Sequence, residues 1–356
     1  MKKKMAFSLI GGIIISTLAL YLAFRRVPFD DLLDSLVSIN YFWIIPSIAA
    51  GLTGFILRVF RWRVILESTH KIGFWHAYHP LMIGFMLNCV LPARVGELAR
   101  PAILYKKDNI PFSTVLATVA AERLFDMLLL IAFFIVVLAN VQIDPNLDIP
   151  FGNLHLNSKT LEAIFKSMIM ISIALIAGVL LISSEKIRKI INQFVMQLPN
   201  KFFFLPSEIK EKIKNNVSII IVKIVDNIAE GFTLVKDPKK LFLCLAYSLI
   251  IWIFNAYSWY LFSLGCPGIG LSFLEISAVM IIVCFFIGLP SVPGFWGLWE
   301  AGGVFALTLF GIAAKDAAAY TLACHVGQMF PVIIIGFISA VILGVNIWQI
   351  QYELSD

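Results

Sequence analysis

Four places in this sequence set charged or polar side chains inside long apolar stretches, and these are where binding or catalysis is expected. A charged group at membrane depth costs about 2.5–3.5 kcal/mol on insertion scales, so it is retained mainly where it serves a function. The first place is the segment from Asn88 to Arg100, in which a short apolar run meets a proline, two arginines, a glycine and a glutamate. Pro92 is expected to end a helix, and Gly96 lets the backbone turn or approach a ligand closely.

The two arginines of this segment are suited to an anionic ligand. The guanidinium groups of Arg94 and Arg100 can each hold a phosphate through two parallel hydrogen bonds. Glu97 follows Arg94 by three positions, so these two side chains can pair if a helix restarts there. The alternative is an ordinary interfacial loop with a salt bridge. We favour a binding site that includes Asn88 and Glu97.

The second place is a charged triplet within the apolar run 113–139. Glu122 and Asp126 lie one helical turn apart, and Arg123 stands between them. Charges inside such a run must face protein or water rather than lipid. They predict either a binding site or a buried network of ion pairs that holds helices together, and the two readings are compatible.

The third place interrupts two apolar runs with glycine and proline. Pro293, Gly294 and Gly297 predict a broken helix, with Glu300 at the start of the next one. Two tryptophans in the same segment, Trp296 and Trp299, are typical of the aromatic belt at a membrane interface. The fourth place is His325 in the last apolar run, where a lone histidine is usually a satisfied polar contact.

The first and third places resemble each other. Pro92 precedes Gly96 by four positions and Pro293 precedes Gly297 by four, each after a short apolar run. Broken helices at corresponding positions of two halves are typical of transporter sites at a repeat interface. We therefore expect a possible inverted repeat whose two breaks share one cavity. Segments 92–97 and 293–300 should meet there, with Arg94 and Glu300 on opposite sides.

The elements that must position these residues are membrane helices. The chain has 356 residues, of which 60% are hydrophobic and 14% charged, and its mean hydropathy is +0.90. These values exclude soluble, disulfide-rich secreted and disordered proteins. The apolar runs begin after Lys4 and then cover roughly 41–60, 75–91, 113–139, 163–183, 241–264, 272–289, 298–312 and 317–348.

Runs of this length predict an all-α integral membrane protein with about 7–9 transmembrane or re-entrant helices, because barrel strands are shorter and alternate in polarity. We interpret 75–91 and 298–312 as re-entrant or broken helices. Residues 1–356 form a single polytopic domain in this interpretation. The first run, up to Phe24, is expected to remain as an uncleaved span.

Charge predicts the orientation. Of the 28 lysine and arginine residues, 22 fall on one side of the membrane if the N-terminus is cytoplasmic. The net charge of +6 therefore indicates basic loops rather than nucleic-acid binding. The five cysteines show no paired spacing and are read as small buried hydrophobic residues. No metal site and no cofactor are expected.

One cytoplasmic insert, about 184–240, is rich in lysine and carries apolar residues at helical spacing. It predicts an amphipathic helix with Lys210, Lys212, Lys214 and Lys223 on its polar face. The helix lies either on the anionic cytoplasmic leaflet or against the ends of the spans.

Together these motifs resemble the flippase-like transmembrane region of lysylphosphatidylglycerol synthases, which also occurs as stand-alone bacterial and archaeal proteins. The similarity extends over almost the whole chain and rests on residues that occur in the family's order: Arg61-Trp62, Asn88, Leu91 to Glu97, Arg100, Glu122-Arg123, Asp126, Pro293-Gly294, Gly297 and Glu300. Two positions depart from it, since the family usually has a second glycine at Phe295 and often an arginine in the last span, where this chain has His325.

The resemblance implies a multi-pass protein of the cell membrane that translocates lipids and is not an enzyme, because the chain ends at Asp356 without the family's soluble aminoacyl-transfer domain. The substrate is then a lipid with an anionic, polyprenyl-phosphate-type or aminoacylated head group. The alternatives are a membrane enzyme acting on a lipid-linked substrate, and a non-catalytic subunit of one. A homo-oligomer or a membrane enzyme partner is possible in this scheme.

Overall fold

The computed structural model describes residues 2–25, 27–67, 70–91, 94–140, 148–151, 154–157, 166–167, 169–170, 173–174, 177–178, 181, 184–201, 206–231, 237–289 and 292–345. Its first helices are α1 (Lys2–Phe24), α2 (Phe29–Ser38), η1 (Tyr41–Trp43), α3 (Ile44–Leu66), α4 (Phe74–Val90), α5 (Gly96–Asp108) and α6 (Phe112–Asn140). A small antiparallel hairpin of β1 (Asp148–Phe151) and β2 (Leu154–Asn157) follows. The remaining elements are α8 (Glu185–Lys201), α9 (Ser207–Ile213), the π-helical segment η3 (Lys214–Ser218), α10 (Ile219–Gly231), α11 (Pro238–Ser263), α12 (Phe273–Phe286), η5 (Pro293–Phe295), α13 (Leu298–Leu309) and α14 (Ala314–Leu343).

The predicted all-α membrane fold is confirmed. In the described part of the chain, Tyr41–Leu66, α11 and α14 are long and apolar enough to cross a membrane. Every predicted apolar run coincides with a helix, except 163–183, which falls largely outside the described residues. The helix boundaries follow local signals. Asp237 caps α11 ahead of Pro238, and Ser272 and Glu275 form a capping box at the start of α12.

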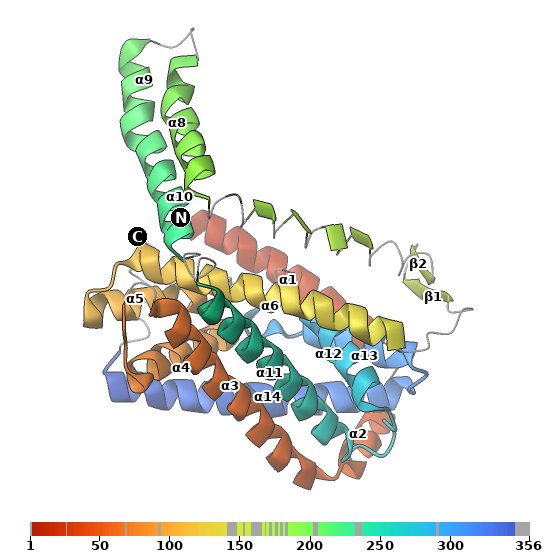
Figure 1. The fold of residues 1–356 in the computed structure, drawn as a ribbon. Coiled ribbons are helices and arrows are strands. Elements are labelled where there is room, and N and C mark those ends of the chain that lie inside the picture. Colours follow the sequence, from red (N-terminus) through yellow and green to blue (C-terminus); the bar gives the residue numbers. More distant parts are fainter. Residues whose placement is uncertain are drawn as a thin grey trace.

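The helices repeat in order. A long helix, a hairpin of two shorter helices and a second long helix occur twice, as α3, α4–α5, α6 and as α11, α12–α13, α14. The two leading helices, α3 and α11, pack against each other along their lengths (Figure 1). Gly51 and Gly54 permit this close approach, since a side chain at either position would contact α11 or α14.

The two helical hairpins come from opposite ends of the bundle. Hairpin α4–α5 lies at the end where α1 begins, whereas α12–α13 lies near α2 and the β-hairpin (Figure 1). The interruptions of the two hairpins meet inside the bundle, because α4 contacts η5. This arrangement supports the predicted inverted repeat. Segment 75–91 forms α4, which ends at the first break, and 298–312 begins with α13, which follows the second break; that these segments are re-entrant stays a prediction.

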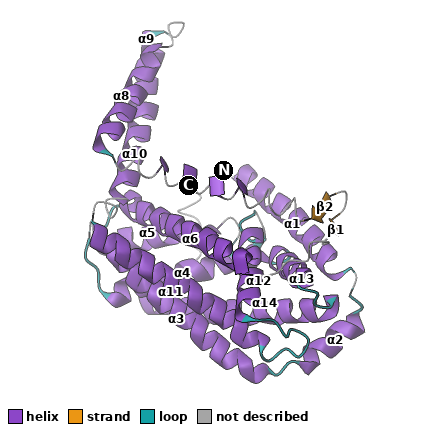
Figure 2. Ribbon diagram, turned by 45° about the vertical axis from the view of Figure 1, so that its right-hand side comes forward, coloured by secondary structure: helices purple, strands orange, loops and turns teal. Residues whose placement is uncertain are grey.

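The lysine-rich insert is helical, as predicted, but consists of two antiparallel arms. One arm is α8, and the other runs through α9, η3 and α10. Of the described helices of this insert, α10 packs on the bundle, against α6, while α8 and α9 project away from it (Figures 1 and 2). Contact of the projecting arms with an anionic leaflet stays a prediction.

Candidate functional site

A network of buried charges joins α3, α5 and α6. Its members are Arg58 and Arg61 from α3, Arg100 from α5, and Glu122 and Asp126 from α6. All five residues are buried, and the most accessible of them, Arg58, is only 8% exposed. The helical spacing predicted from sequence brings Glu122 and Asp126 onto one face of α6. That face is turned toward the arginines and away from lipid.

The network is held by charge-assisted hydrogen bonds. Arg61 donates to Asp126 from both terminal nitrogens, from Nη1 to Oδ1 at 2.5 Å and from Nη2 to Oδ2 at 3.1 Å. Arg58 Nη1 lies 3.3 Å from Asp126 Oδ2, and Arg100 Nη1 donates to Glu122 Oε2 at 2.6 Å. Arg61 Nη1 also donates to Ser248 Oγ on α11 at 2.7 Å. The network therefore ties the first repeat to the second, as the structural reading of the triplet expects.

Two further residues extend the network to its accessible edge. Arg123 Nε lies 3.8 Å from Glu97 Oε1, and Arg123 Nη1 lies 3.7 Å from Asp126 Oδ2. The side chains of Arg123 and Glu97 are 35% and 28% exposed. The seven linked side chains comprise four guanidinium groups and three carboxylates. Their formal charge is therefore +1, with the open edge at Arg123.

Aromatic rings surround the guanidinium groups. The Phe85 ring centroid lies 4.8 Å from the Arg100 guanidinium carbon, 5.6 Å from that of Arg58 and 5.8 Å from that of Arg123. Trp62 also faces Arg100 and donates from Nε1 to Thr118 Oγ1. Such contacts stabilise desolvated cations.

Several buried polar atoms of the cluster have no hydrogen-bond partner among the described residues. These are Nε of Arg61, Arg100 and Arg123, and Oδ1 of Asn88. Buried polar groups are normally satisfied, and Arg123 Nε has only its 3.8 Å ion pair with Glu97. Three of the four are donors, which suits an anion.

Arg94 marks the contact between the two breaks. Its backbone is left-handed, and its Nη2 donates to the carbonyl oxygen of Ile287 after α12 at 2.8 Å. Its guanidinium carbon also lies 5.8 Å from the Phe295 ring centroid. The predicted meeting of the two broken segments is confirmed. The suggested pairing of Arg94 with Glu97 is wrong, because α5 begins only at Gly96 and turns Glu97 toward Arg123.

The glycine at the start of α5 is needed for close packing. A Cβ at Gly96 would collide with the carbonyl oxygen of Gly84 on α4 and crowd Asn88 Oδ1. Gly297 occupies the corresponding place before α13 and has φ +89°. Pro92 and Ala93 lie outside the described residues, as do Pro290 and Ser291.

Glu300 and His325 form a second buried centre at the other break. His325 Nδ1 lies 2.6 Å from Glu300 Oε1, and His325 Nε2 lies 2.8 Å from the Gly294 carbonyl oxygen. The amide of Gly297 donates to Glu300 Oε2 at 2.6 Å. The expected opposition of Arg94 and Glu300 across a cavity is wrong, since Glu300 is fully buried and paired with His325.

The two tryptophans belong to this second centre. The rings of Trp296 and Trp299 each lie 4.4 Å from the His325 ring, and Trp299 also stacks on Trp259. These rings therefore have partners inside the bundle, and their assignment to an interfacial aromatic belt stays a prediction. Periodicity could not reveal this, because the contacts bring together α11, α13, α14 and η5.

Sequence reasoning missed Arg58 and Arg61 as members of the cluster. Both were counted among the basic residues of the cytoplasmic side, because the predicted run 41–60 ends beside them, whereas α3 continues to Leu66. The apolar residues Val64, Ile65 and Leu66 beyond them were the available signal. Arg100, like Arg94, was expected to hold a phosphate. Instead it is buried against Glu122, while Arg94 is exposed.

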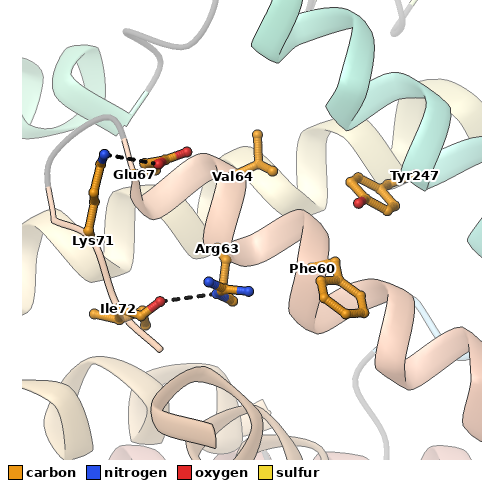
Figure 3. Close-up of a pocket in the computed structure, with 7 residues that line it drawn as sticks. All are labelled: Phe60, Arg63, Val64, Glu67, Lys71, Ile72 and Tyr247. Atoms are coloured by element: carbon orange, nitrogen blue, oxygen red, sulfur yellow. Dashed lines mark hydrogen bonds and ion pairs between the residues drawn. The ribbon is translucent and has the colours of Figure 1, made fainter. Parts of the chain in front are cut away.

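A separate hollow of about 290 Å³ lies at the end of α3, near α11 (Figure 3). Arg63 projects into it and donates from Nε to the Ile72 carbonyl oxygen at 3.0 Å. Lys71 and Glu67 form an ion pair at its edge, and Phe60 and Tyr247 supply an apolar wall. It is distinct from the charged cluster, because the two share no residue.

Comparisons with known proteins found a matching family and a protein with partial similarity. The family model described as the lysylphosphatidylglycerol synthase TM region matches residues 9–336. A protein named glycosyltransferase AglD from Haloferax volcanii is 26% identical over 144 residues. That match covers 40% of this chain and 23% of the archaeal protein, so the chain spans about a quarter of its length.

Proposed function

Because this chain belongs to the lysylphosphatidylglycerol synthase transmembrane-region family, we propose that it moves a lipid with an anionic head group across the membrane. The family supports a membrane protein that acts with lipids. The finer assignment, translocation of a phosphate-bearing head group, rests on the charged cluster.

The observation that carries this proposal is the uneven charge of the network. Four guanidinium groups face three carboxylates in a largely buried setting, and a lone charge in an apolar environment is strongly unfavourable unless it is paired. A phosphate monoanion or diester would supply the missing charge. It would enter at the accessible edge, where the Arg123 guanidinium can donate two parallel bonds, and Arg94 at the contact between the breaks offers a second guanidinium.

The lipid tails would stay in the bilayer while the head group crosses between the hairpins. Exposed apolar side chains on α14, such as Phe330, Ile334, Phe337 and Val341, offer a suitable lipid-facing surface. The seam between Arg94 and the Ile287 carbonyl is the contact that must open for passage.

Reconstituted vesicles containing fluorescent phosphatidylglycerol test the proposal. Dithionite added outside bleaches only the outer leaflet, so leaflet exchange appears as bleaching beyond the outer fraction. Arg94→Lys should lower the exchange rate about tenfold or more, because losing one charge-assisted hydrogen bond costs about 1.5–3 kcal/mol. Exchange in Arg94→Lys vesicles equal to wild type would show that a guanidinium fork is unnecessary there.

Arg63→Lys is the matched control for this variant. Arg63 is also an arginine that donates to a backbone carbonyl, yet it lies at the hollow near the end of α3 and not at the contact between the two breaks. Its replacement should leave the exchange rate unchanged. Equal losses in both variants would instead indicate a general effect on folding or insertion.

A second candidate is glycosyl transfer to a lipid-linked substrate. The partial similarity to the archaeal protein named as a glycosyltransferase favours it. The same vesicles separate the two functions: exchange of a chemically unchanged lipid supports transport, whereas a new lipid product on addition of nucleotide sugars supports the enzyme.

The orientation and partners are part of this proposal. We place the N-terminus, α5 and the α8–α10 insert on the cytoplasmic side of the cell membrane, where the basic residues gather. The lipid substrate and the anionic cytoplasmic leaflet are the proposed partners. A further copy of the chain or a membrane enzyme would complete any larger assembly.

A further inference from the structure

We propose that Glu300 and His325 form a binding site for one exchangeable proton, and that this proton controls the seam between the two hairpins. The inference rests on the proposed function insofar as it concerns transport. The proton site itself is argued from hydrogen-bond geometry.

The proton count follows from donors and acceptors. His325 Nε2 lies 2.8 Å from a carbonyl oxygen, which can only accept, so Nε2 carries a hydrogen. His325 Nδ1 lies 2.6 Å from Glu300 Oε1, which requires one more proton between these two atoms. The pair therefore holds that proton, either as imidazolium with carboxylate or as neutral imidazole with carboxylic acid. Both forms have zero net charge.

Loss of this proton leaves a buried negative charge. The Nδ1 lone pair would then face a carboxylate oxygen at a distance made for a hydrogen bond, and the two would repel. Glu300 is fully buried and His325 is 1% exposed, so water does not relieve the repulsion in this arrangement. The pair must separate or recover a proton.

The surroundings offer no other described charge in direct contact with the pair. Trp296 and Trp299 cover the imidazole, and Trp259 backs them. Among the titratable groups of neighbouring elements, α4 contributes Cys89, α12 contributes Cys284, and α14 contributes Tyr320 and Cys324. The Tyr320 hydroxyl donates to the Trp259 carbonyl oxygen, and Arg94 faces Phe295 and Ile287.

The pair is connected to the seam. Glu300 accepts from the Gly297 amide and His325 donates to the Gly294 carbonyl, so together they fix both ends of the break before α13. Gly294 packs closely on the Cys89 carbonyl at the end of α4, and Phe295 lies against Arg94. Binding the proton therefore holds the two breaks together, and releasing it loosens them beside the charged cluster.

The Glu300→Gln variant keeps the hydrogen bonds of the proton-bound pair but has no exchangeable proton between the two side chains. The glutamine oxygen can accept from the Gly297 amide while its NH₂ group donates to Nδ1 of neutral His325. The variant should fold and keep the seam closed, but lose its response to pH. Glu275→Gln is the matched control, because Glu275 is also the capping-box glutamate of a hairpin helix but is bonded to exposed Ser272.

Tryptophan fluorescence in detergent follows the proton, because Trp296 and Trp299 lie against the imidazole and their surroundings change when the pair loses its proton and separates. Over a series of pH values, wild type and Glu275→Gln should show a reversible step in emission that Glu300→Gln lacks. The same step in Glu300→Gln, or no step in wild type, would overturn the proton site.

Vesicle exchange of fluorescent phosphatidylglycerol then tests coupling. The wild-type exchange rate should rise with pH over the range of the fluorescence step, because the proton-bound fraction, which holds the seam closed, falls about tenfold per pH unit beyond its midpoint. The Glu300→Gln rate should be low and independent of pH. A fluorescence step without any lipid exchange would support the proton site and contradict the proposed transport. Exchange that ignores pH despite the step would overturn the control of the seam.

Discussion

Asp126 is the residue on which the charged network depends, because it accepts hydrogen bonds from both Arg58 and Arg61. Asp126→Asn removes one negative charge and leaves these two guanidinium groups with the more distant Glu122 alone. Breaking a buried ion pair costs about 3–5 kcal/mol. We expect a clear drop in the thermal midpoint of the detergent-solubilised protein, measured by a thiol-independent unfolding assay.

Glu67→Gln provides the comparison at the same scale. Glu67 pairs with Lys71 at 3.5 Å, but both side chains are largely solvent-exposed. Exposed pairs contribute about 0–1 kcal/mol, so the midpoint should barely move. If Asp126→Asn were as stable as Glu67→Gln yet defective in lipid exchange, the carboxylate would serve the ligand and not the packing.

Individual residues differed in how far the sequence could predict them. Glu122, Arg123 and Asp126 were found because three charged residues in an apolar run are tolerated only where they are buried with partners or face water. Arg58 and Arg61 were missed because arginines near the end of an apolar run can mark either the end of the helix or a buried part of a longer helix. Sequence alone does not distinguish these two cases until the partner, Asp126, is located in the fold. His325 was underestimated for the same reason, since Glu300 lies on another helix.

At the scale of elements, the crossing of α4 and α5 depends on two facing glycines. Gly96→Ala would drive a methyl group into the carbonyl oxygen of Gly84. We expect this variant to lose stability and lipid exchange together, because Arg100 follows on the same helix. Gly270→Ala is the control, with open space around its added methyl group. An undisturbed Gly96→Ala protein would mean that the hairpin can splay without consequence.

The meeting of the two breaks can be tested by chemical cross-linking. In a background lacking the five native cysteines, cysteines at positions 94 and 295 should react with a short bifunctional thiol reagent, because these side chains face each other. Cross-linked protein should migrate as a closed loop after proteolysis in the α8–α10 insert. Cysteines at 94 and 270 serve as the unlinked comparison, and efficient linking of that pair would refute the specific contact.

The broken elements themselves were predictable, since proline and glycine act on the local backbone. Their relationship was predictable only in part. The shared spacing of Pro92–Gly96 and Pro293–Gly297 identified two matching hairpins, while the partners of Arg94, Glu97 and Glu300 depend on tertiary packing that periodicity does not contain. Trp296 and Trp299 show the limit clearly, because the same composition fits an aromatic belt and an aromatic enclosure.

For the whole molecule, the projecting α8–α10 arms raise the question of what they touch. Ile190, Phe194 and Leu198 form an exposed apolar stripe along α8, with Lys189 on the other side of the helix. We expect the stripe to enter an anionic bilayer surface. An environment-sensitive fluorophore at position 194 should shift to shorter wavelength in phosphatidylglycerol vesicles relative to phosphatidylcholine vesicles.

The same fluorophore at position 189 is the control for that measurement. Position 189 lies on the polar side of α8, so its emission should resemble that in water in both kinds of vesicle. Identical emission from positions 189 and 194 would show that the arms stand clear of the membrane. The fold class and the existence of this insert were predictable from composition, but its two-armed form was not, because a turn between helices of similar pattern leaves little trace.

The ring of Phe85 has a consequence for lipid selectivity. Three guanidinium groups already lie within 5.8 Å of its centroid, and the ring of Phe55 packs edge-on at 4.9 Å. Its electron-rich surface is therefore occupied by cations that belong to the protein. A choline head group, which aromatic cages bind through such surfaces, finds neither a vacant ring nor a favourable field at Phe85. We therefore expect the protein to discriminate against zwitterionic choline lipids before any contact with the phosphate is made.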